Sequence, residues 1–344
     1  MKDFLKIDKF GRAPIYKQMV DSIETAARSG ALSDGDMLPS MNELALLLDI
    51  SKETVKKSYG ILCDRGILEP RQGRGFFVRL RADARQRRIL MLLDRLSPYR
   101  QALLDEFSAT VGPDSQITIL LHNQSTELLK YYLDRHLGEY DYYVVTPHFP
   151  LDAQSQKVVC HQLGRIPNRK LILADRCPED MQGNSGAVYQ DYACDAAAAL
   201  STAEEELMKY PEIDVFTMPN SLYGEMVESS IRSFCEGAGL KMRVHRDITP
   251  DAIHRNQVCL LVNSQADKAL FSVNRIAAQK GLEIGSDIKL ISYNESPINE
   301  LVFGGLSTMS ADFVNMGRQC AQMILDGKMS KVKADFHLIR RKTF

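Results

Sequence analysis

Apolar residues recur at helical spacing in two neighbouring segments between residues 38 and 78. The first set is Leu44, Ala45, Leu47 and Leu48, and the second is Val55, Tyr59 and Leu62. This period predicts two short helices separated by a turn at Asp49-Ile50, the second running from about Lys52 to Asp64. Two apolar runs, 67–69 and 76–78, then flank a basic, glycine-containing turn. The segment therefore predicts two helices followed by a β-hairpin.

Residues suited to helix ends stand at the expected boundaries of these two helices. Ser40 can cap the first helix, and Glu43 follows it at the capping-box spacing. Ser51 can cap the second helix in the same way. Gly66 can adopt positive φ and end it.

Beyond residue 88, short apolar runs alternate with amphipathic stretches. The expected strands are Ile89–Leu93, Ile117–His122, Tyr142–Thr146, Lys170–Ala174, Asp214–Met218, Cys259–Val262 and Lys289–Tyr293. The expected helices are Pro98–Ala109, Ser125–His136, Asp152–Leu163, Tyr192–Lys209, Tyr223–Gly237, Ala266–Gln279 and Val314–Leu325. This alternation predicts an α/β body of parallel sheets covered on both faces. It contains too many units for one compact sheet of this type, which indicates two lobes.

The composition is that of a globular protein. The 344 residues are 44% hydrophobic and 25% charged, as in globular proteins. No apolar run is long enough to span a bilayer, and the N-terminal residues lack the apolar stretch of a signal peptide. Seven scattered cysteines predict reduced thiols in the cytoplasm, and the seven histidines show no ligand spacing, so we expect no structural metal.

Positive charge is concentrated at one place in the chain. Residues 51–88 contain eleven Lys and Arg against four Asp and Glu, whereas residues 89–344 carry a net charge of −6. A basic helix-turn-helix segment is typical of a protein that displaces counterions from DNA phosphates. The arginine-rich residues 79–88 lack apolar periodicity and are expected to form a linker, with a connector that lies near the DNA backbone as the alternative.

Residues 12–78 closely resemble the DNA-binding domain of GntR-family bacterial transcription regulators. The resemblance rests on the motifs LPS, NELA, S-K-x-T-V, R-G-I-L and Q-G-x-G-F-F-V. It implies a winged helix-turn-helix that binds double-stranded DNA. The implied contact residues are Ser40, Asn42, Ser51, Lys52, Glu53, Thr54 and Lys56 for the helices, and Gln72, Gly73 and Arg74 for the wing.

Three of these positions depart from the family pattern. Asn42 and Lys52 stand where arginine is frequent, and Glu53 stands where a small hydroxyl residue is frequent. Lysine cannot make the planar two-bond contact that arginine makes with guanine, whereas glutamate can accept from cytosine. The operator sequence is therefore not expected to match those of relatives.

Polar and aromatic residues follow most of the expected strands of the body. In parallel α/β sheets, ligands bind beyond the carboxyl ends of the strands. Amides, carboxylates and rings suit a polyhydroxylated ligand, although Asp and Asn after a strand often only cap the next helix. The candidate ligand-binding residues from this pattern are Ser97, Asn123, His148, Asp175 and Arg176.

The segment 258–326 resembles the end of the effector domain of the LacI family, which has the periplasmic-binding-protein fold. The resemblance rests on C-L-L-V-N, Tyr293-Asn294, Leu306-Ser307-Thr308, Asp312-Phe313 and Gly317-Arg318. It places Asn263 and Asn294 in the ligand pocket, with Tyr223 as a further candidate. Asn294 replaces the usual aspartate, so the charged contact to sugar hydroxyls is not expected here.

We therefore expect a cytoplasmic, homodimeric transcription regulator, a repressor released from its operator by a monosaccharide or a related sugar. Its expected parts are a DNA-binding domain (1–78), a linker (79–88) and a two-lobed effector-binding and dimerisation domain (89–344). We expect no cofactor and no membrane partner.

Two alternatives remain open from the residues. In one, the body only dimerises, or responds to a non-sugar molecule or a protein partner. In the other, the body is an enzyme. Some regulators with this head carry a pyridoxal-phosphate-binding aminotransferase body, but that body needs roughly a hundred more residues. The chain also contains no nucleophile elbow or phosphate-binding loop, so we expect no catalytic residues.

Overall fold

The computed structural model describes residues 5, 7–8, 13–28, 30–79, 86–217, 222–262 and 266–344. Contacts within the chain divide it into two compact units, and the boundary in the sequence falls between Gln86 and Arg87. Most of the expected linker and the ligand candidate Asn263 lie outside the described residues.

The first unit is a helical domain with a small antiparallel sheet. Helix α1 (Ile15–Arg28) precedes α2 (Met41–Leu48) and α3 (Lys52–Asp64). The sheet has the strand order β1-β3-β2, formed by Met37–Leu38, Gly75–Val78 and Leu68–Arg71. Side chains from all three helices and the sheet share one apolar core. This is the winged helix-turn-helix fold expected from the sequence.

The predicted caps explain where α2 and α3 begin. The Ser40 hydroxyl accepts from the Glu43 amide, and the Glu43 carboxylate accepts from the Ser40 amide, which completes a capping box. Ser51 accepts from the Thr54 amide at 3.1 Å. One detail was wrong: Leu47, expected in the apolar stripe, is 45% exposed, because this short helix buries only a narrow face around Leu44.

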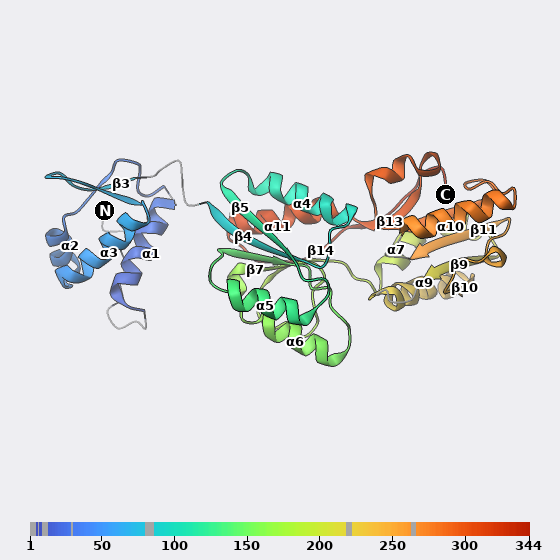
Figure 1. Ribbon diagram of the computed structural model, residues 1–344, viewed down its shortest axis with the longest axis horizontal. Helices are drawn as coiled ribbons and strands as arrows, with labels where there is room; N and C mark the ends of the chain where they lie inside the picture. Colours follow the sequence, from blue (N-terminus) through green and yellow to red (C-terminus); the bar gives the residue numbers. More distant parts are fainter. Residues whose placement is uncertain are drawn as a thin grey trace. The chain divides into compact units, whose positions relative to one another are not determined.

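The second unit contains two lobes, each built on a six-stranded sheet. In the N-lobe, the strand order is β14-β8-β7-β6-β4-β5, and every pair is parallel. Helices α4 and α11 cover one face, and α5 and α6 cover the other (Figure 1). The strands are β4 (Arg87–Leu93), β5 (Ser115–Leu121), β6 (Tyr142–Val145), β7 (Leu171–Asp175), β8 (Gly186–Tyr189) and β14 (Lys331–Lys333). The helices are α4 (Pro98–Val111), α5 (Thr126–His136), α6 (Ala153–Leu163) and α11 (Phe313–Asp326).

The C-lobe repeats this architecture with the strand order β10-β9-β11-β12-β13-β15, in which only β15 is antiparallel. Helices α7 and α9 pack on one face of its sheet and α10 packs on the other. The strands are β9 (Glu212–Thr217), β10 (Lys241–His245), β11 (Gln257–Val262), β12 (Ile288–Tyr293), β13 (Ser307–Ala311) and β15 (Phe336–Ile339). The helices are α7 (Asp195–Ser201), α8 (Glu204–Leu207), α9 (Gly224–Ala238) and α10 (Ala266–Gln279). Short 3-10 turns are η1 (Asn168–Lys170), η2 (Pro250–Ala252), η3 (Pro297–Glu300) and η4 (Val302–Gly304).

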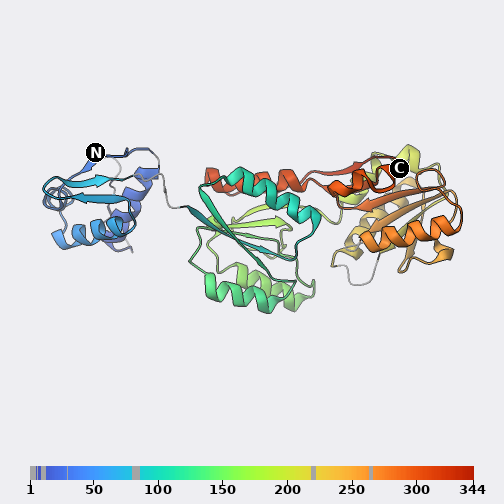
Figure 2. The same cartoon turned by 45° about the horizontal axis from the view of Figure 1, so that its top comes forward.

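The chain passes between the two lobes three times. It crosses from β8 to α7, returns from β13 to α11, and crosses again from β14 to β15 (Figure 2). Each lobe is therefore assembled from separate stretches of the sequence, and the crossings lie side by side at the junction of the lobes.

The seven strands expected in the body are present, and the five others were not predicted. Strands β8 and β14 are short, β10 and β15 are partly exposed, and β13 is a buried strand with a polar sequence, Ser307–Ala311. The expected helix Tyr192–Lys209 is divided, because α7 ends at Ser201 and α8 begins at Glu204. Strand β4 begins at Arg87, two residues earlier than expected.

The packing of α4 against α11 leads to a stability prediction. A Cβ on Gly317 of α11 would clash with the backbone oxygen of Leu103 in α4. We expect Gly317→Ala to lower the free energy of unfolding by about 1–3 kcal/mol, because the helices must separate. Denaturant unfolding of the purified chain measures this loss. Gly237→Ala is the control, since no atom lies within 4 Å of its added Cβ. An equal loss in both variants would contradict the role of close helix packing.

Candidate DNA-binding surface and ligand pocket

The predicted DNA-contacting residues lie at two places in the first unit. Ser51, Lys52, Glu53 and Lys56 are exposed at the start of α3, and Thr54 beside them is half-buried. Ser40 and Asn42 are exposed at the start of α2. The wing tip between β2 and β3 exposes Gln72, Gly73 and Arg74. Gly73 has φ +71°, a conformation that favours glycine and allows a tight turn.

A cavity of about 90 Å³ lies between the two lobes, at the carboxyl ends of several strands. Both lobes and two of the crossings contribute to its walls. Its lining residues are Asp94, Arg95, Tyr99, Arg100, Gln124, His148, Asp175, Gln190, Tyr192, Leu222, Tyr223, Gly224, Val227, Val262, Tyr293, Asn294 and Phe313. We refer to it as the pocket.

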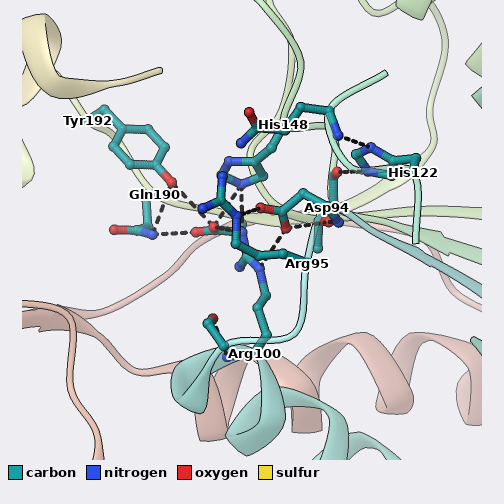
Figure 3. Close-up of polar contacts among 11 residues, drawn as sticks. Asp94, Arg95, Arg100, His122, His148, Gln190 and Tyr192 are labelled. Carbon is teal, nitrogen blue, oxygen red and sulfur yellow. Dashed lines mark hydrogen bonds and ion pairs between the residues drawn. The ribbon is translucent and has the colours of Figure 1, made fainter. Parts of the chain in front are cut away.

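Arg100 is the central charged residue of the pocket. Its side chain projects from α4 and is 1% exposed (Figure 3). The guanidinium Nε lies 3.0 Å from an oxygen of Asp94, and Nη2 lies 2.6 Å from an oxygen of Asp175. His148 Nε2 lies 2.9 Å from Nη2 and 2.8 Å from the same Asp175 oxygen. A buried cation is therefore paired with two buried carboxylates.

The pKa values in this cluster follow from burial and from the paired charges. Burial alone would raise the pKa of Asp94 and of Asp175, but Arg100 and His148 outweigh it and hold both below the ordinary value. Burial alone would lower the pKa of Arg100, but Asp175 and Asp94 raise it. Both carboxylates are therefore ionised and Arg100 is charged at neutral pH.

Three buried polar atoms of the pocket have no hydrogen-bond partner among the described residues. They are Nη1 of Arg100, Oε1 of Gln190 and the hydroxyl of Tyr223. The other end of the Gln190 amide donates to Asp175, which leaves its oxygen as an acceptor. Leaving buried polar groups unpaired is costly, so this arrangement is suited to a ligand that both accepts and donates hydrogen bonds.

Aromatic rings provide the apolar part of the wall. Tyr192 and Tyr223 are stacked with their centroids 4.3 Å apart, and His148 meets Tyr223 edge-on at 4.9 Å. Tyr99 and Phe313 lie beside the Arg100 guanidinium, with their centroids 5.3 Å and 5.7 Å from its central carbon. Ring faces next to buried polar groups are typical of pockets that orient a small ligand.

His122 supports the pocket without lining it. Its ring stacks on Phe149 at 4.2 Å, Nε2 donates to the Thr146 carbonyl, and Nδ1 accepts from the Gln124 amide. Burial lowers the pKa of His122 to about 4, so the imidazole is neutral at physiological pH. The ring therefore holds the loop from which Gln124 reaches the pocket.

The sequence-derived ligand candidates occupy different positions. His148, Asp175, Tyr223 and Asn294 line the pocket. Ser97 caps α4, which is the structural role that Asp and Asn residues after strands often have. Asn123 is exposed. Arg176 lies over the Tyr223 ring at 5.7 Å, next to the pocket wall.

Several lining residues were not among the candidates. Arg100 lies within helix α4, and the only sign of its role in the sequence is a charged residue at a position that the helix buries. Gln190 and Tyr192 follow β8, a strand that the sequence did not reveal. The backbone gives a further signal that only the structure carries: Asp175 and Asn294 have φ of +72° and +69°. Such conformations are rare outside glycine and cluster at functional sites.

Comparisons with known families match both units. Residues 15–78 match the family model described as bacterial regulatory proteins, gntR family. Residues 197–343 match the model of a periplasmic binding protein-like domain. In the described part of the chain, no helix combines the length and apolar character needed to cross a membrane.

Two curated relatives each match about a fifth of the chain. The transcriptional repressor YtrA of Bacillus subtilis is 35% identical over 74 residues, which are 22% of this chain and 57% of YtrA. The mannosyl-D-glycerate transport/metabolism system repressor MngR of Escherichia coli is 35% identical over 69 residues, 20% of this chain and 29% of MngR. The chain thus spans between about a third and little more than half of these two relatives.

Solved structures match the body. The dimeric Lac repressor with a C-terminal deletion superposes with a TM-score of 0.59 at 14% identity, covering 74% of this chain and 98% of that one. The trehalose repressor of Escherichia coli gives a TM-score of 0.58 at 12% identity, covering 74% and 99%. The chain therefore joins a GntR-type helix-turn-helix domain to a periplasmic-binding-protein-like body with the fold of the LacI-family repressors.

Proposed function

We propose that this protein is a transcription regulator whose body senses a neutral, polyhydroxylated small molecule of the monosaccharide class. The observation that carries the proposal is the group of three unpaired polar atoms around Arg100, buried between two lobes on a chain with a GntR-type head. Hydroxyl groups both donate and accept, so a sugar can satisfy Nη1 of Arg100 and Oε1 of Gln190 together.

The charges of the pocket favour a ligand without a phosphate. Asp94 and Asp175 are both ionised, and Arg100 already neutralises them in part. Arg95 lies 3.4 Å from Asp94, so it too is paired. A phosphate dianion would face two carboxylates with few free cations, whereas a neutral polyol meets no such repulsion.

Ligand binding would act on DNA binding through the angle between the lobes. Because both lobes supply pocket residues, a ligand that contacts both favours the closed arrangement. Such coupling is typically about 1–3 kcal/mol between two sites. We propose a homodimer that reads two half-sites about one helical turn apart, so that a change in body geometry changes the spacing of the heads.

The direction of control is proposed from the relatives. YtrA, MngR and the trehalose repressor are all named as repressors. We therefore propose repression that the ligand relieves, carried out in the cytoplasm, where bacterial DNA lies.

The Tyr223 hydroxyl gives a test of the ligand class. We first expect a thermal-shift panel of pentoses, hexoses, deoxyhexoses and their phosphates to show stabilisation by one or a few free sugars only. A ligand at a hundredfold over its Kd adds about 2.7 kcal/mol to the stability of the protein.

We then expect Tyr223→Phe to weaken the binding of that sugar roughly 3- to 10-fold, the value of one hydrogen bond, as measured by calorimetry. Stabilisation by sugar phosphates alone would contradict the neutral-ligand proposal.

Tyr132→Phe is the matched control for this substitution. Its hydroxyl donates to the Leu121 carbonyl and lies outside the pocket lining. We expect the affinity of Tyr132→Phe for the sugar to equal that of the parent chain. No stabilisation by any member of the panel would favour a body that only dimerises, or one that responds to a non-sugar ligand.

Lys52 and Arg74 give a test of the DNA-binding surface. We expect Lys52→Ala and Arg74→Ala to weaken binding to an operator selected from random duplexes, because each removes an exposed cation from α3 or the wing. The slope of log K against log salt should fall by about 1 for each phosphate contact that is lost. Fluorescence anisotropy at several salt concentrations measures both effects. Lys130→Ala on α5 is the control, and a slope unchanged in the two head variants would rule out the proposed contacts.

A further inference from the structure

Glu212, Asp214 and His254 bring their donor atoms together in the C-lobe, away from the pocket. One oxygen of each carboxylate and one nitrogen of the imidazole all lie within 4.8 Å of one another. Glu212 and Asp214 project from the start of β9, on the face that carries Phe216, and His254 follows the turn η2. The pocket lies at the opposite, carboxyl ends of the C-lobe strands, so this cluster has no part in the proposed ligand binding.

Asp214 is held in one orientation by two side chains that hydrogen-bond to it. The residue has no exposed surface. His245 Nε2 lies 2.6 Å from one carboxylate oxygen, and Gln257 Nε2 donates to the other at 2.7 Å. A carboxylate oxygen has two lone pairs, so each retains one. Hydrogen bonds of this kind commonly orient the carboxylate ligands of metal ions.

The ring of His254 presents a lone pair to Asp214. Its Nδ1 lies 3.2 Å from the Arg255 carbonyl, which can only accept, so Nδ1 carries the proton. In a neutral ring, Nε2 therefore holds a lone pair, and it faces an Asp214 oxygen 3.8 Å away. This separation is too long for a hydrogen bond. It suits two donors that share one metal ion with bonds of about 2.0–2.2 Å each.

Glu212 supplies the third donor at the mouth of the cluster. Its side chain is 18% exposed, and its carboxylate lies 3.0 Å from Arg243 Nη2, which limits its movement. The His254 side chain is 40% exposed, so an ion can enter from solvent. Two carboxylates with one imidazole suit Zn²⁺ and similar ions better than Mg²⁺ or Ca²⁺, which prefer oxygen ligands.

The geometry points to a divalent transition-metal site, of the Zn²⁺ class, formed by Glu212, Asp214 and His254, with water as the remaining ligand. The ion would join the start of β9 to the turn before β11. No structural metal was expected from the sequence, because the histidines show no short ligand spacing. His254 is 42 positions from Glu212, so no local motif could reveal the site.

Zinc titration of the chelator-treated full chain tests the site. By calorimetry, we expect one Zn²⁺ per chain, bound at least tenfold more weakly in His254→Gln and in Glu212→Gln. Thermal unfolding of the parent chain should shift upward by several degrees with excess Zn²⁺. The control is His337→Gln on exposed β15 of the same lobe, which should bind as the parent does. Absent binding, or equal binding in His254→Gln, would overturn the proposal.

The seven cysteines are the main competing ligands, and Co²⁺ distinguishes them from the proposed set. Co²⁺ bound to nitrogen and oxygen donors gives only weak visible bands, whereas thiolate ligands add an intense charge-transfer band. We expect one equivalent of Co²⁺ to give the weak bands, which Zn²⁺ then removes. A thiolate band at that equivalent would assign the ion to cysteine and overturn the proposal.

Discussion

The buried ion cluster of Arg100 with Asp94 and Asp175 is the interaction on which the body depends most. A guanidinium with 1% exposure is tolerable only while its carboxylates stay in place, and breaking such a buried pair typically costs about 3–5 kcal/mol. Asp94 follows β4 and Asp175 is the last residue of β7, whereas Arg100 belongs to α4. The cluster thereby fixes a helix to the edge of the sheet where the pocket lies.

This same helix is tied to the junction of the lobes. Leu103, one turn after Arg100, packs its backbone against Gly317 of α11, and Glu106 forms an ion pair with Arg318 at 2.8 Å. Helix α11 directly follows the crossing from β13. A ligand that changes the hydrogen bonding of Arg100 therefore acts on α4, and α4 contacts α11, the helix that follows a crossing between the lobes. The polar contacts of the pocket are thus connected to the junction of the lobes through the packing of α4 against α11.

Much of this architecture could be predicted from local signals. The capping serines of α2 and α3 set their starts, and apolar periodicity located the strands of the parallel sheets. Prediction failed where local sequence and environment disagree. Strand β13 is a run of Ser, Thr, Met, Ser and Ala that is buried because its neighbours cover it, not because it is apolar. The expected helix 192–209 is interrupted near Thr202, a boundary that the amphipathic pattern does not mark.

The pocket residues also fall into those that local sequence rules found and those that depend on packing. The rule that ligands bind at strand ends selected His148 and Asp175, because it uses only order along the chain, and the LacI-family resemblance selected Asn294. The structure places all three around the pocket. Arg100 and Gln190 were not selected, since their roles depend on packing between distant segments. The Glu212–His254 cluster is a third case: its donors come from the start of β9 and from the loop after η2, which only the fold brings together.

The three crossings also have a consequence for the synthesis of the chain. Helix α11 and strand β14 complete the N-lobe but are encoded after almost the entire C-lobe, at residues 313–333. While the chain emerges from the ribosome, the DNA-binding unit is complete by about residue 79, and domains generally fold as units in this order. Neither sheet has all of its strands until β14 and β15 have been synthesised. During translation, a finished DNA-binding unit therefore precedes a body whose pocket still lacks Phe313 of α11.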